Sequence, residues 1–69
     1  MKLRWRSFIG RAVRIHTPEQ SIEGVLTHAY RDVLILNAAQ LLTEGSKPIP
    51  LDGEVVLERS RISFGQVLG

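Results

Sequence analysis

The sequence contains no cysteine, few aromatic residues and no long apolar run. Without Cys, disulfides and most structural zinc sites are excluded. The longest purely aliphatic run, residues 33–36, is far shorter than the roughly 20 apolar residues of a membrane-spanning helix. No apolar stretch follows the basic start, as a signal peptide would require. We therefore expect a cytoplasmic protein with no membrane partner.

The chain is also short, at 69 residues, and we expect one domain over 1–69. A chain of this size buries only about 60% of the surface that its unfolded form exposes. Such small domains often depend on disulfides, a metal or self-association for stability. Because there is no Cys, self-association is the expected source of additional stability.

Charge is distributed unevenly along the chain, although the net charge is only +2. The first sixteen residues contain no acidic side chain, so the remaining chain is net acidic. Such an asymmetry is typical of proteins that bind nucleic acid or an acidic protein surface. The alternative is that these cations are solvated side chains at the ends of a strand. The basic residues of this segment are Lys2, Arg4, Arg6, Arg11 and Arg14.

Short apolar segments alternate with turn signals, which indicates a mainly β protein. Val13 and Ile15 share one parity with apolar neighbours, while Arg14 and His16 share the other. Four or five such strands in a chain of this length predict a small, strongly bent antiparallel barrel. The expected strands are 11–17, 21–30, 33–42, 54–57 and 62–68, the last with Ile62, Phe64 and Val67 turned inward.

Two segments are ambiguous. Residues 2–9 fit either a short helix or a strand. Residues 33–42 open with four aliphatics, as a buried strand would, but Asp32 could cap a helix there and Gly45 could end it. The helical alternative gives an α+β module instead of a barrel. Residues 43–53 contain two prolines and two glycines, which predicts a loop without regular structure.

The order of motifs resembles the Sm/LSm (Sm-like) family over residues 8–68. A first motif would cover 10–42, a variable loop 43–53 and a second motif 54–68, after an arm or short helix at 1–9. The resemblance makes 33–42 the third, sharply curved strand of a five-stranded, SH3-type barrel. The residues that carry it are Gly10-x-x-Val13-x-Ile15, Gly24-Val25-Leu26 and Gly53-Glu54-Val55-Val56-Leu57, followed by Ile62.

The resemblance also implies a homo-oligomeric ring of about five to seven subunits. In Sm-like rings the fourth strand of one subunit pairs with the fifth strand of the next. Exposed apolar edge strands aggregate unless they are paired, and ring closure pairs every edge. The residues that we expect at this interface are Val55, Val56, Leu57, Phe64, Val67 and Leu68.

The family's uridine pocket is not carried over. By spacing from Gly24, the family's acid falls on Tyr30, and its Met-Asn pair falls on Val33 and Leu34. The Arg-Gly pair of the second motif falls on Glu58-Arg59. The asparagine that would hydrogen-bond a base is therefore an aliphatic residue here.

Other residues could still bind a nucleic-acid strand. Tyr30 could stack on a base, with His28 on the same face two residues away. Arg31 and Arg59 could contact phosphates near the same loops. A second candidate surface is the basic arm, Lys2, Arg4, Arg6 and Arg11, which a ring would repeat around one face. Trp5, between Arg4 and Arg6, is expected to pack within the protein instead of binding nucleic acid.

No motif for catalysis or for metal or cofactor binding is present. His16 and His28 lack ligand spacing, and there is neither a nucleophile elbow nor a Gly-rich phosphate loop. We expect a non-enzyme without a cofactor. The first hypothesis is a ring that binds RNA or single-stranded nucleic acid with low sequence specificity. The alternative is a structural or adaptor ring that binds an unknown protein, similar to divergent Sm-like proteins encoded by phages.

Overall fold

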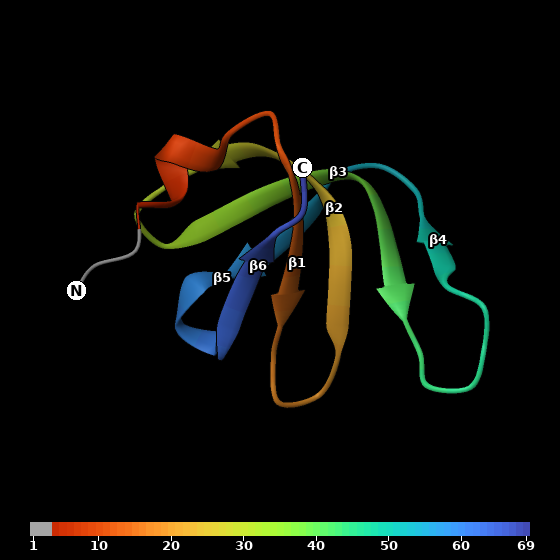
Figure 1. The fold of residues 1–69 in the computed structure, drawn as a ribbon. Helices are drawn as coiled ribbons and strands as arrows, with labels where there is room; N and C mark the ends of the chain where they lie inside the picture. The colour runs from red at the N-terminus through yellow and green to blue at the C-terminus, as the bar shows by residue number, and fades with distance from the viewer. Residues whose placement is uncertain (1–3) are drawn as a thin grey trace.

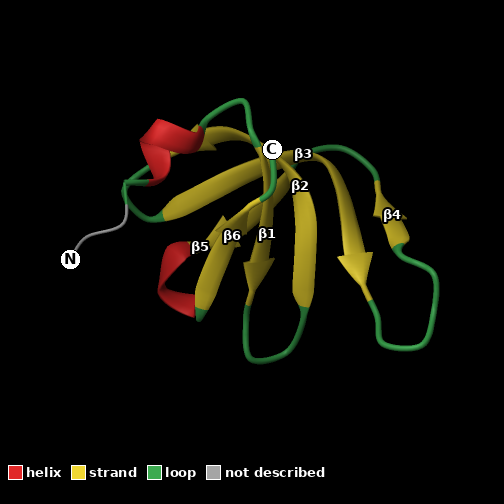
Figure 2. Ribbon diagram, viewed as in Figure 1, coloured by secondary structure: helices red, strands yellow, loops and turns green. Residues whose placement is uncertain are grey.

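The computed structural model describes residues 4–69 as one bent antiparallel sheet with two short 3₁₀ helices (Figures 1 and 2). Residues 33–42 form a strand, so the helical alternative for this segment is wrong. The described part of the ambiguous N-terminal segment contains a 3₁₀ helix. In chain order the elements are η1 (Trp5–Phe8), β1 (Ala12–His16), β2 (Ser21–Ala29), β3 (Val33–Leu42), β4 (Ile49–Leu51), β5 (Val55–Glu58), η2 (Arg59–Arg61) and β6 (Phe64–Val67).

The sheet is strongly bent, but it does not close into the expected barrel. Its strands pair in the order β4-β3-β2-β1-β6, and β5 pairs with β3. Within residues 4–69 no ladder joins β5 to β6. The helix η2 lies between these two strands in the chain. Each of them is therefore paired on one side only, and the sheet keeps two open edges.

The structure has six strands instead of five because the fourth strand position is divided in two. Both β4 and β5 pair with β3, β4 opposite residues 39–41 and β5 opposite residues 33–36. Between them Gly53 has a φ of +75°, a conformation that glycine adopts without strain. The prediction that 43–53 lacks regular structure is thus wrong for β4. Pro50 is tolerated there because β4 lies at the edge of the sheet.

The first irregularity of β2 lies at Gly24. The β2–β3 register shifts between Glu23 and Val25, and opposite this shift Ala38 has a φ of 51°. A Cβ on Gly24 would lie 3.0 Å from the Ala39 Cα. A second shift lies between Leu26 and His28. These bulges bend both strands and turn the end of β2 toward η1, which packs against β2.

Most of the buried apolar side chains form one core cluster. Trp5 is 6% exposed and packs in this core, as predicted. Ile62 packs against the core, but Phe64 is 57% exposed and Val67 37% exposed, so their predicted inward orientation is wrong. Gly65, opposite Ile15, takes the place beside Trp5 instead. The core residues are Trp5, Val13, Ile15, Ile22, Leu26, Leu34, Leu36, Ala39 and Leu57.

Candidate nucleic-acid interface

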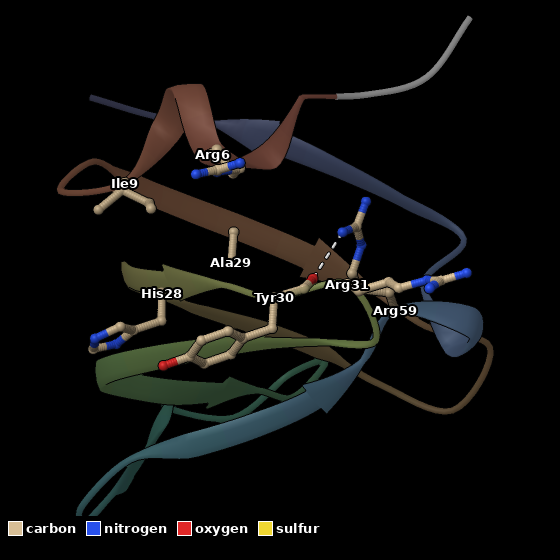
Figure 3. A pocket seen from close by; sticks show the side chains of 7 residues that line it. All are labelled: Arg6, Ile9, His28, Ala29, Tyr30, Arg31 and Arg59. Atoms are coloured by element: carbon tan, nitrogen blue, oxygen red, sulfur yellow. Dashed lines mark hydrogen bonds between the residues drawn. The ribbon is translucent and has the colours of Figure 1, made fainter.

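An open hollow of about 510 Å³ lies where β2 ends. It is lined by the end of β2, the turn into β3, the segment around η1 and the first residue of η2 (Figure 3). We call it the aromatic hollow. Its size is within the range of about 300–1,000 Å³ that is usual for ligand sites. Its lining residues are Arg6, Ile9, His28, Ala29, Tyr30, Arg31 and Arg59.

Two aromatic side chains lie together on one side of this hollow. The rings of His28 and Tyr30 are nearly parallel, at an interplanar angle of 8°, and their centroids are 5.7 Å apart. Their spacing of two residues predicted that they share a face, and the structure brings them together. Tyr30 is 55% exposed. A large part of its ring surface is therefore accessible to a stacking partner.

Thr27 determines which nitrogen of His28 carries hydrogen. The Thr27 hydroxyl donates to the Ile35 carbonyl at 3.2 Å. Its oxygen lies 3.2 Å from His28 Nδ1, and because the hydroxyl hydrogen is already used, Nδ1 donates. In the neutral imidazole, Nε2 is then the acceptor. Nε2 is therefore the ring nitrogen that remains available to a ligand.

Arg59 connects η2 to the end of β2. Its Nη1 donates to the Tyr30 carbonyl at 2.8 Å, and its backbone N–H donates to the Asp32 carbonyl at 2.8 Å. These bonds hold the half-buried arginine against the β2–β3 turn (Figure 3). A guanidinium has five N–H donors. Arg59 therefore keeps donors for an anionic ligand while one of them fixes its position.

The charge of the aromatic hollow is of one sign. Three arginines line it: Arg6 from η1, Arg31 from the β2–β3 turn and Arg59 from η2. Of residues 4–69, none that lines this hollow is acidic. The combination of guanidinium groups with an exposed aromatic ring suits a phosphate ester that carries a flat base.

The described residues of the basic arm lie in different places on the structure. Arg6 lines the aromatic hollow, while Arg4 lines a neighbouring hollow over η1. Arg11 is directed elsewhere, because its Nε donates to the Gly69 carbonyl at 2.7 Å. Arg14 forms an ion pair with Glu23 at 2.7 Å. Lys2 lies outside the described residues.

Sequence reasoning missed Arg6 and Ile9 as neighbours of Tyr30. More than twenty residues separate them in the chain, and no spacing rule joins a 3₁₀ helix to the end of a distant strand. Arg31 and Arg59 were expected near the same loops as Tyr30, and both line the hollow.

The predicted interface residues lie on the two open edges. Val56 on β5 is 60% exposed, and Phe64 on β6 is 57% exposed. Val67 and Leu68 are exposed as well, whereas Val55 is half-buried. Leu57 is only 8% exposed, and its side chain belongs to the core of its own subunit. For Leu57, only backbone groups could take part in pairing between subunits.

No helix in residues 4–69 has the length and apolar character needed to cross a membrane. The same residues bring together no group of three or more His, Asp or Glu side chains that could hold a metal ion.

In comparisons with known proteins, no family model matches this sequence, and a search of curated proteins finds no significant relative. The resemblance to the Sm-like family therefore stays a prediction.

Proposed function

We propose that this protein is a ring-forming, Sm-like β domain that binds RNA or another single-stranded nucleic acid with low sequence specificity. The observation that carries this proposal is the aromatic hollow. It combines three arginines with the stacked pair of His28 and Tyr30, and no acidic side chain of the described chain lines it.

Binding in this hollow would combine stacking with phosphate contacts. A base stacks on the exposed Tyr30 ring, and such a contact contributes about 1–3 kcal/mol for any base. Arg31 and Arg59 contact the phosphates, which provide affinity without sequence information. The aliphatic residues at 33 and 34 cannot hydrogen-bond a base edge. Low sequence specificity follows from this set of groups.

Self-association through the open edges would multiply these contacts. The outer edge of β5 and the outer edge of β6 have no partner within residues 4–69, and each edge exposes an apolar side chain. Pairing β5 of one subunit with β6 of the next leaves neither of these two strand edges free once the ring closes. Several weak sites on one ring can engage one strand together, which raises the overall affinity steeply.

The first test compares Tyr30→Ala with Tyr30→Phe. We expect the alanine variant to bind oligo-U and oligo-A more weakly, by about 5- to 150-fold for each stacking contact of about 1–3 kcal/mol that is lost. The phenylalanine variant keeps the ring and should bind like the wild type. Fluorescence anisotropy with labelled oligonucleotides at physiological salt measures both.

Two results would overturn this proposal. One is wild-type affinity for every oligonucleotide at the level of non-specific binding. The other is equal affinity of the wild type and the alanine variant. If a ring forms but does not bind nucleic acid, the adaptor function becomes the better explanation, and the exposed apolar side chains of β5 and β6 would be its candidate contacts.

A further inference from the structure

A second hollow adjoins the aromatic hollow on the side of η1. It has a volume of about 340 Å³ and is lined by Arg4, Trp5, Arg6, Ser7 and Arg59. We call it the η1 hollow. Arg6 and Arg59 line both hollows. The two concavities are therefore neighbours that meet at these two guanidinium side chains.

Charge distinguishes this hollow from another neighbour of the aromatic hollow. Another hollow shares Arg31 and Arg59 with the aromatic hollow, but Asp32 and Glu58 also line it, so its formal charge is balanced. In the described chain, the η1 hollow is lined by three arginines and no acidic side chain. A bound polyanionic strand that extends beyond the aromatic hollow is thus attracted toward η1 and not toward Asp32 and Glu58.

The η1 hollow has no aromatic face available for a base. Trp5 lines it but is 6% exposed, and its indole packs toward Gly65 in the core. Stacking of a base requires an accessible ring face. The groups that remain available are guanidinium N–H donors and the Ser7 hydroxyl. These groups suit a phosphate and not a base.

We propose that the ligand unit of this protein is longer than a mononucleotide and occupies both hollows. A base stacks on Tyr30, and a phosphate next to that nucleotide lies in the η1 hollow, held by Arg4 and Arg6. This inference rests on the proposed function and specifies its substrate class, a single strand that presents consecutive phosphates. It also assigns Arg4 a binding role distinct from that of Arg11, which is hydrogen-bonded to Gly69.

The test uses two small ligands that differ by one phosphate, adenosine 5′-monophosphate and adenosine 3′,5′-bisphosphate. We expect the bisphosphate to bind about tenfold more tightly, the gain typical of a charge-assisted hydrogen bond. This gain should shrink as salt rises from about 50 to about 200 mM, because the attraction between the added phosphate and the guanidinium groups is screened. Calorimetry measures the affinities. The single Trp provides a local signal, because the indole N–H resonance of Trp5 should shift with the bisphosphate only.

Arg4→Gln should remove most of the gain, because only Arg6 of the proposed pair remains, and it should leave the affinity for the monophosphate unchanged. The fold should tolerate this change, because the Arg4 side chain makes no capping bond to η1. Arg61→Gln is the matched control, since Arg61 belongs to η2 but lines a different hollow, beside β5. This variant should keep the gain.

The inference and the proposed function fail in different ways. Equal binding of the two ligands, with Tyr30-dependent binding of oligonucleotides intact, would overturn the inference alone. Equal losses in the Arg4 and Arg61 variants would also overturn it, because they would indicate a general charge effect. If neither the small ligands nor the oligonucleotides bind, both the inference and the proposed function are wrong.

Discussion

Gly65 makes room for the only tryptophan of the chain. A Cβ at this position would overlap the six-membered ring of Trp5 and would lie 3.4 Å from the Ile15 Cδ1. We therefore expect Gly65→Ala to lower the free energy of unfolding by about 1–3 kcal/mol, the usual cost of inserting a methyl group into a packed core. Urea denaturation measures this loss.

Trp5→Phe provides the control for this clash, since phenylalanine lacks the outer atoms of the indole. The cost of the added methyl group should be smaller in this background, and a double-mutant cycle measures the difference. An equal cost in both backgrounds would mean that the glycine is needed for another reason, such as the backbone conformation of β6.

The bend of β3 depends on one residue in an unusual backbone conformation. Ala38 has a φ of 51°, which is costly for β-branched side chains. We expect Ala38→Val to lower the free energy of unfolding by about 1–2 kcal/mol relative to Ala38→Gly. Strand propensity alone predicts the opposite order of stability, because valine is favoured over glycine in strands. Thermal and urea unfolding measure it.

Gln40→Val in the same strand is the matched control. Gln40 is exposed like Ala38, but it is not among the described residues with a positive φ. Valine should be tolerated there. If both valine variants lose the same stability, the loss comes from exposing an apolar side chain and the backbone argument for the bend is wrong.

The strands themselves could be predicted where their patterns are local. The alternation of Val13 and Ile15 with polar residues predicted β1. The short strand β4 was missed because Pro50 and its neighbours indicate a loop, while only the long free side of β3 gives this segment a partner. The inward direction of Phe64 was wrong because Gly65, opposite Ile15, sets the parity of β6.

The candidate site could be predicted only in part. The spacing of His28 and Tyr30 placed both rings on one side, and the loops placed Arg59 nearby. The participation of Arg6 could not be read from the chain, since it depends on how η1 packs against β2. The sequence also did not reveal that the barrel stays open. Whether β5 pairs with β6 depends on the path of the chain through η2.

At the scale of the whole molecule, the two open edges of the sheet predict assembly. Val56 lies on the outer strand β5 and is 60% exposed. A lysine side chain at this position can therefore extend into solvent without disturbing the fold of a single subunit. Lysine on an edge strand opposes pairing with another chain. We expect the wild type to form a single assembly of about five to seven copies and Val56→Lys to be monomeric. Native mass spectrometry of protein purified without nuclease measures both.

Ile49→Lys is the matched control for this change. Ile49 is 48% exposed and lies on β4, at a different part of the edge from β5. Because β4 has no role in the proposed pairing of β5 with β6, this variant should assemble like the wild type. Loss of assembly in both variants would indicate that added charge acts generally. A wild type that stays monomeric would contradict the ring directly, and nucleic-acid binding would then have to come from single subunits, without the gain in affinity from multiple sites.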